Sequence, residues 1–236
     1  MTIVSFDFLS VSGIALLVVL MIKIIASIDF FSKVWYNEIV MRCISEDDKQ
    51  IAIEALNKGA ILGVPTETVY GLAVKADNTE AIKKLLNLKE RPLGSGKVLT
   101  MMVANVDEMF KYANMNRRQT NFARHYFPGE LTMILPKNEA FSHPYFDKVK
   151  TIGIRIPQHQ YMLDLLRETG PLLVTSANPR GEKPCYTSKE LSKRMPSVDM
   201  VVDGRAGGSI PSTIIDFTQD DPYPVRQGGL LIVRYA

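Results

Sequence analysis

Apolar positions along the chain alternate between helical and strand periodicity. Between Ser45, which can cap a helix, and Gly59, which can end one, apolar side chains recur at three- and four-residue spacing. Further helices are predicted at 79–88, 107–112, 117–126, 161–168 and 188–194. Strands are predicted at 60–64, 98–103, 131–135, 151–155, 172–175, 200–202, 213–217 and 231–234. The strand-rich C-terminal third favours an α/β fold with a mixed sheet flanked by helices over a doubly wound parallel one.

The most apolar stretch, residues 11–28, contains a single charge, Lys23. It divides the chain into a hydrophobic extension, 1–40, and a main domain, 41–236. One interpretation is a short membrane helix, with the main domain in the cytoplasm by the positive-inside rule. Another is a non-native upstream extension of a chain that starts at Met41. A secretory signal is not indicated, because the first ten residues contain an acidic residue, Asp7, and no basic residue.

The amino-acid composition limits the kinds of ligand and metal that the chain is expected to bind. The chain has 236 residues, 46% of them hydrophobic, and a net charge of +3, which favours a small anionic ligand over a long polyanion. Cys43 and Cys185 have no metal-ligand spacing, and the three histidines are scattered. We therefore expect no protein-bound transition metal and a reducing, cytoplasmic setting.

Polar clusters follow several of the apolar runs, although neither GxxxxGK[ST] nor GxGxxG occurs. In α/β folds such positions line the ligand crevice. Lys89 and Arg91 suit an anion, or are a solvated helix end. Arg155 ends an apolar strand and needs an anionic partner, either a ligand or a structural ion pair. Ser176 and Asn178 are a candidate nucleophile and helper without a nearby base, or turn residues.

Motifs spread over residues 48–228 together resemble the YrdC-like threonylcarbamoyl-AMP synthase family in its short form. They are Pro65-Thr66-Glu67-Thr68-Val69-Tyr70-Gly71-Leu72, Lys89-x-Arg91-Pro92, Pro128-Gly129-x-Leu131-Thr132, Gly153-x-Arg155-x-Pro157, Ser176-Ala177-Asn178, Asp203-Gly204, Ser212-Thr213 and Arg226-x-Gly228. The resemblance implies a twisted sheet with a large concave pocket. It also implies a nucleotidyltransferase that joins L-threonine, bicarbonate and ATP to give threonylcarbamoyl-AMP and pyrophosphate for a separate tRNA threonylcarbamoyl transferase complex.

The resemblance also implies roles for individual residues. The catalytic set would be Lys89, Arg91, Ser176 and Asn178, the threonine and bicarbonate set Thr68, Arg155 and Ser212, and the ATP set Lys89, Arg91, Lys97, Thr151, Ser176 and Arg226. Mg²⁺ would arrive with ATP rather than in a protein cage. The segment from Leu93 to Lys97 is longer than the family usually shows.

Three rival functions stay open at this point, and one of them is a membrane-tethered adaptor whose anchor is residues 11–28. A double-stranded RNA-binding module could use a concave basic surface, and weak RNA binding could also accompany the enzyme. Related domains adenylate carbamoyl groups during hydrogenase maturation, but they come with acylphosphatase and zinc-finger parts.

Overall fold

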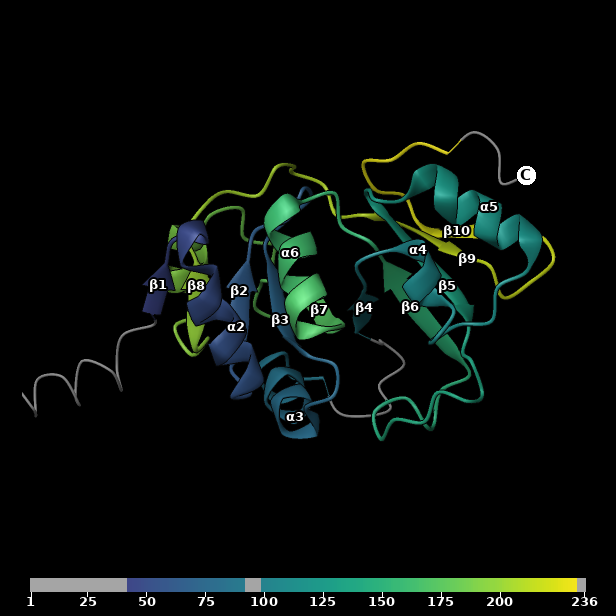
Figure 1. Ribbon diagram of the computed structural model, residues 1–236. Helices are drawn as coiled ribbons and strands as arrows, with labels where there is room; N and C mark the ends of the chain where they lie inside the picture. Colours follow the sequence, from purple (N-terminus) through teal and green to yellow (C-terminus); the bar gives the residue numbers. More distant parts are fainter. Residues whose placement is uncertain (1–41, 92–98, 233–236) are drawn as a thin grey trace, which may run out of the picture. The chain divides into compact units, whose positions relative to one another are not determined.

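A ten-stranded sheet organises the chain in the computed structural model, which describes residues 42–91 and 99–232 (Figure 1). Its strands are β1 (Arg42–Ile44), β2 (Leu62–Val64), β3 (Gly71–Lys75), β4 (Thr100–Met102), β5 (Leu131–Pro136), β6 (Thr151–Arg155), β7 (Leu172–Ser176), β8 (Met200–Val202), β9 (Thr213–Asp216) and β10 (Tyr223–Arg226). Their order across the sheet is β1-β8-β2-β3-β7-β4-β6-β5-β9-β10. Because the sheet contains both parallel pairs, such as β4 and β6, and antiparallel pairs, such as β5 and β6, the predicted mixed sheet is confirmed.

The helices connect these strands. They are the 3₁₀ helix η1 (Glu46–Asp48) and the α-helices α2 (Lys49–Asn57), α3 (Thr79–Leu88), α4 (Val106–Met109), α5 (Arg117–Tyr126), α6 (Gln160–Thr169) and α7 (Ser188–Arg194). Local caps fix two of them at the predicted boundaries. Asn116 and Gln119 form a capping box at α5, and Thr187 accepts a hydrogen bond from the Glu190 amide at α7.

Three strands were not predicted: β1, β3 and β10. β3 directly follows the polar 65–70 cluster, and β10 is an exposed edge strand that contains Pro224, so neither shows alternating burial. The predicted last strand, 231–234, extends past the described residues, and residues 231 and 232 lie in no strand.

Two predictions concern residues outside those that the structure describes: the 1–40 extension with its apolar stretch at 11–28, and Lys97 in the 92–98 segment. Across 42–91 and 99–232, the structure contains no helix with the length and apolar character that a bilayer crossing requires.

The sheet buries a different apolar cluster on each face. In β7, Leu173 belongs to the cluster that includes residues of α3, α5 and α7, whereas Leu172 and Val174 belong to the cluster that includes α2 and α6. Helices α2 and α6 lie side by side over β2 and β3 (Figure 1). In β5, Leu131, Met133 and Leu135 enter the first cluster, so that the residues between them face the opposite side of the sheet.

Candidate active site

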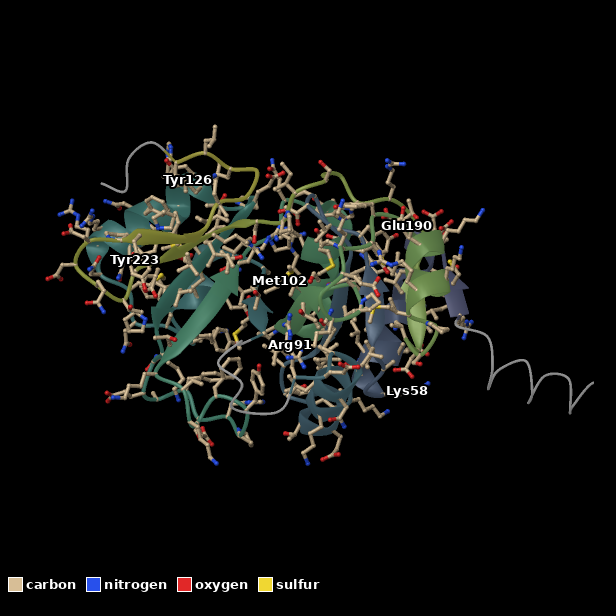
Figure 2. All side chains as sticks on the ribbon, turned by 180° about the vertical axis from the view of Figure 1, so that it is seen from behind. Lys58, Arg91, Met102, Tyr126, Glu190 and Tyr223 are labelled. Carbon is tan, nitrogen blue, oxygen red and sulfur yellow. The ribbon has the colours of Figure 1, made fainter. Side chains whose placement is uncertain are left out.

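A cavity of about 610 Å³ lies over that opposite side. Its apolar lining comes from residues such as Met102, Ile134 and Val174. Its charged lining residues are Arg91, Arg155 and Arg226, and no acidic side chain lines it within the described parts of the chain. Arg91 and Met102 are labelled in Figure 2. The complete lining is Thr66, Thr68, Val69, Tyr70, Gly71, Arg91, Thr100, Met102, Thr132, Ile134, Arg155, Val174, Thr175, Ser176, Pro211, Ser212, Ile214, Val225 and Arg226. Three cations in a partly apolar cavity favour an anionic ligand.

Arg155, at the end of β6, meets the polar turn that precedes β3. One of its terminal nitrogens lies 2.9 Å from Glu67 Oε1 and donates to Thr68 Oγ1 at 3.0 Å. The Thr68 hydroxyl lies 2.9 Å from Thr66 Oγ1, and Thr66 donates to the Val69 carbonyl at 2.7 Å. Glu67 Oε2 and Arg155 Nε are buried and have no hydrogen-bond partner among the residues that the structure describes. Arg155 therefore has both the structural ion pair and the cavity position that the sequence left as alternatives.

Arg226, at the end of β10, holds the loop that precedes β9. Its guanidinium donates to the Ser212 carbonyl at 2.8 and 3.0 Å and to Ser212 Oγ at 3.2 Å. Ser212 Oγ also lies 2.9 Å from Thr132 Oγ1. Burial, followed by the nearby Arg155 charge, lowers the pKa of Arg226. We call Thr68, Arg155, Ser212 and Arg226 the arginine wall.

The end of α3 places Lys89 and Arg91. The Glu90 amide donates to the Asn87 carbonyl and the Arg91 amide to the Leu86 carbonyl, which is the Schellman pattern. Glu90 takes the left-handed position with φ of 49°, where glycine is usual. Arg91 consequently reaches Thr175 Oγ1 at 3.2 Å and lines the cavity.

Lys89 is only 1% exposed and does not line the cavity. Its ammonium donates to the Ser176 carbonyl at 2.9 Å, to Asn178 Oδ1 at 3.1 Å and to the Asn178 carbonyl. Asn178 Oδ1 also accepts from the Ser176 hydroxyl at 2.6 Å. An ammonium has three N–H groups, so all of them are engaged by protein acceptors. We call Lys89, Ser176 and Asn178 the lysine cluster.

The buried position of Lys89 also changes its titration. Burial, followed by the neighbouring Arg91 charge, lowers the pKa of Lys89 to about 8. The protonated form of Lys89 is consequently less favoured than that of a surface lysine, and the three oxygen acceptors around it stabilise its charge.

Six of the predicted site residues line the cavity: Thr68, Arg91, Arg155, Ser176, Ser212 and Arg226. Lys89 and Asn178 do not line the cavity, but both are hydrogen-bonded to Ser176, which does. Thr151 lies on the same face of β6 as Arg155 because the two are four residues apart, but about 13 Å of strand separates them. Gly153 lies between them on that face, and a Cβ there would meet only the Thr132 methyl group at 3.6 Å.

Several lining residues, among them Thr132 and Thr175, were given no role from the sequence. Thr132 alternates with the buried Leu131 and Met133 in β5, so this alternation could have placed it on the cavity side. No group of three or more histidine, cysteine or acidic side chains within 42–91 and 99–232 is arranged to hold a metal ion.

The mixed sheet and the cavity lined by three arginines define an α/β protein with a cationic cavity. The Sua5/YciO/YrdC family model, described as telomere recombination, matches residues 54–228. The chain belongs to this family, which confirms the resemblance inferred from its motifs.

Sequence and structural similarity to individual relatives supports this family membership. The chain is 32% identical over 84% of its length to threonylcarbamoyl-AMP synthase of Bacillus subtilis, and 31% identical over 70% to that of Vibrio campbellii. Sua5 of P. abyssi, solved in complex with L-threonine, superposes over 81% of this chain with a TM-score of 0.73 and 27% identity. The chain spans 91% of the Vibrio protein, but only 59% of the Bacillus protein and 58% of the P. abyssi chain.

Proposed function

We propose that this chain is an L-threonylcarbamoyladenylate synthase, which joins L-threonine, bicarbonate and ATP to give threonylcarbamoyl-AMP and pyrophosphate. The observation that carries the proposal is the cationic cavity lined by Arg91, Arg155 and Arg226 in a member of this family. All three substrates are anionic or carry a carboxylate. Relatives that bear this activity in their names, and a solved relative that binds L-threonine, support the same assignment.

The arginine wall is the proposed threonine site. It includes Arg226, which the resemblance assigned to ATP, because Arg226 is hydrogen-bonded to Ser212. Arg155 and Arg226 supply positive charge for the carboxylate, and Thr68 and Ser212 supply short polar groups beside them. The apolar lining, including Ile214, suits a methyl group. Arg155 is held by Glu67, so its position is set before a ligand enters.

ATP occupies the rest of the cavity in this proposal. Arg91 and Ser176 contact the triphosphate, and Lys89 acts on it through the positions of Ser176 and Asn178. Thr151 and Lys97 remain predictions for the nucleotide, because Thr151 lies at the far end of β6 and Lys97 lies outside the described residues. Gly153 leaves the surface between Arg155 and Thr151 free of side chain. Mg²⁺ would enter bound to the phosphates of ATP.

The proposed chemistry needs positioning more than a protein nucleophile. The threonine amine attacks bicarbonate, and loss of water leaves a carbamate. A carbamate oxygen then attacks the α-phosphorus, and the bond to pyrophosphate breaks. Negative charge that develops at the phosphorus and on pyrophosphate is stabilised by Arg91, while the arginine wall holds the amino acid in place.

We also propose that the product passes to a separate tRNA threonylcarbamoyl transferase complex in the cytoplasm. The two free thiols, Cys43 and Cys185, agree with a reducing compartment. No observation on the described residues favours the double-stranded RNA-binding alternative, and weak RNA contact stays a prediction.

Pyrophosphate release measures this function directly. Purified protein is incubated with ATP, Mg²⁺ and bicarbonate, with each amino acid in turn, and the adenylate is identified by mass spectrometry. We expect release that requires both bicarbonate and threonine. Reactions without bicarbonate, and with valine in place of threonine, are the controls. Equal rates with serine and threonine would contradict the substrate assignment, and salt-dependent RNA binding without threonine-dependent ATP consumption would favour the alternative.

A further inference from the structure

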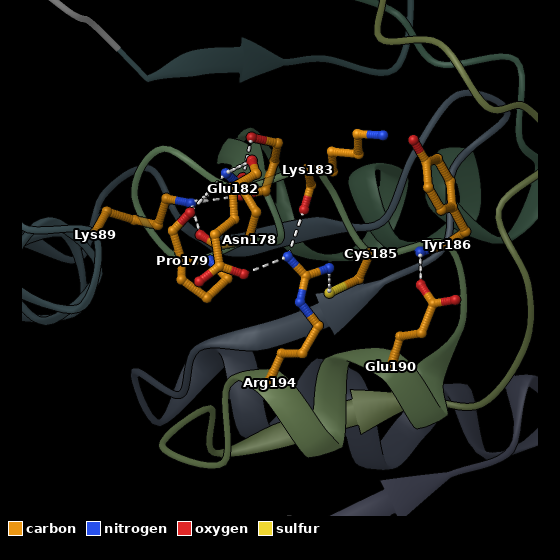
Figure 3. Close-up of polar contacts among 10 residues, drawn as sticks. Lys89, Asn178, Pro179, Glu182, Lys183, Cys185, Tyr186, Glu190 and Arg194 are labelled. Carbon is orange, nitrogen blue, oxygen red and sulfur yellow. Dashed lines mark hydrogen bonds and ion pairs between the residues drawn. The ribbon is translucent and has the colours of Figure 1, made fainter.

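Arg194, in the last turn of α7, contacts the loop that follows Asn178 and not the cavity itself. Its guanidinium donates to Glu182 Oε2 at 2.9 Å and to the Lys183 carbonyl at 2.6 Å, and it lies 3.3 Å from the Cys185 sulfur. Figure 3 shows Arg194 directed at these three residues, with Lys89 approaching Asn178 from the other side. A guanidinium presents its donors in one rigid plane, so that it can hold several acceptors in a fixed arrangement.

The same loop fixes the side chain of Asn178. Its amide nitrogen donates to the Pro179 carbonyl at 2.9 Å and to the Glu182 carbonyl at 2.8 Å. Its amide oxygen accepts from Lys89 and from Ser176. Every polar atom of this side chain is therefore engaged, and its orientation depends on where the 179–185 loop lies.

The far end of the loop is joined to the sheet. The Cys185 amide donates to the Ala177 carbonyl at 2.7 Å, and the Cys185 carbonyl accepts from the Tyr70 amide at 3.0 Å. Between Asn178 and Cys185, the Arg194 side chain is what links the loop to α7 through Glu182 and Lys183. Arg194 therefore contacts Glu182, whose carbonyl accepts from the Asn178 side chain, and Asn178 in turn accepts from Lys89.

We propose that Arg194 is a positioning residue for the lysine cluster: it anchors the 179–185 loop and thereby fixes Asn178 for Lys89 and Ser176. The inference rests on the proposed function only for its effect on catalysis, because anchoring of the loop is a property of the free protein. Glu182 is the weaker part of the anchor, since its carboxylate is largely exposed and its ion pair is screened by water.

The first test is hydrogen exchange of the free full-length protein. In Arg194→Gln we expect the amides of Glu182 and Cys185, which donate to the Pro179 and Ala177 carbonyls, to exchange about ten-fold faster or more, because local opening of the 179–185 loop becomes less costly. Amides of β7 should keep their wild-type rates. Lys193→Gln, which removes a charge from the exposed neighbouring position of the same helix, is the matched control and should exchange as wild type. Unchanged exchange in 179–185, or faster exchange throughout the chain, would overturn the proposal.

The second test separates the two sides of the cavity. Arg194→Gln should lower kcat/KM for ATP by about ten-fold, while the Kd of threonine from calorimetry changes by less than about two-fold. Arg194→Lys should resemble Arg194→Gln, and Glu182→Gln should have a smaller effect, because the Lys183 and Cys185 contacts remain. Full rescue by lysine, or equal loss of threonine binding, would overturn the positioning role. A wild-type protein without synthase activity but with faster loop exchange in Arg194→Gln would contradict the proposed function and support the anchor.

Discussion

The arginine wall and the lysine cluster both use buried cations, but they engage them differently. Arg155 keeps a buried Nε without a partner among the described residues, even though one of its terminal nitrogens contacts both Glu67 and Thr68. Lys89 has no N–H left, since its ammonium is shared between two carbonyls and one amide oxygen. The arginine wall therefore retains donor capacity for a ligand, whereas the lysine cluster uses its cation to shape the protein around Ser176 and Asn178.

The largest effect that tests this difference is expected from substitution of Arg155. Arg155→Met leaves the Glu67 carboxylate, 12% exposed, without its cation, and we expect a loss of about 3 to 5 kcal/mol in the free energy of unfolding. Threonine affinity should fall by about 100-fold or more, because a buried charged contact is lost. Urea unfolding and calorimetry measure the two effects.

A double variant separates them. Arg155→Met with Glu67→Gln removes both charges, so stability should recover in large part while threonine binding stays lost. Threonine affinity that recovers together with stability would show that Arg155 is a structural residue only.

Substitution of Lys89 probes the other side of the comparison. Lys89→Met should lower kcat by on the order of 100-fold, because Ser176 and Asn178 lose their common donor, with the Kd of threonine changed by less than about two-fold. Pyrophosphate release and calorimetry provide the two readings. Equal loss of threonine binding would remove the distinction between the two sides.

The pH dependence of Lys89 sharpens this prediction. With a pKa of about 8, below the usual 10.5, Lys89 loses its proton as pH rises through 8, so kcat should fall on the alkaline side. Between about pH 8 and 10.5 the unfolded chain binds more protons at this lysine than the folded protein does. The free energy of unfolding should therefore rise with pH relative to Lys89→Met in that window. As pH rises through this window, kcat should fall while the free energy of unfolding, relative to Lys89→Met, should rise.

The smallest effect concerns the turn that presents both cations. Glu90 has φ of 49°, a conformation that costs a residue with a side chain about 1 kcal/mol relative to glycine. Glu90→Gly should raise the free energy of unfolding by up to that amount, reduced by the greater entropy of the unfolded chain. Thermal unfolding measures the change, and Glu80→Gly, inside α3, should instead destabilise the protein.

Much of the fold could be predicted because helix signals in this chain are local. The Asn116 and Thr187 caps fix α5 and α7 at the predicted residues. β3 was missed because both of its faces are buried, with Leu72 and Val74 in one apolar cluster and Ala73 in the other, so that burial does not alternate along the strand. The candidate site was recognised through motifs, but the contact between Thr68 and Arg155 joins residues 87 positions apart, and no local pattern could predict its partners.

The hydroxyl of Thr66 has a further consequence for how a substrate enters the site. Its single proton goes to the Val69 carbonyl, so the hydrogen bond between Thr66 and Thr68 must use the proton of Thr68. Thr68 Oγ1 also accepts from Arg155, which leaves it only a lone pair to offer. A ligand atom that meets Thr68 therefore has to be a donor. For an amino acid this means its amine or hydroxyl and not its carboxylate, so a proton held by one buried threonine sets which end of the substrate can face this turn.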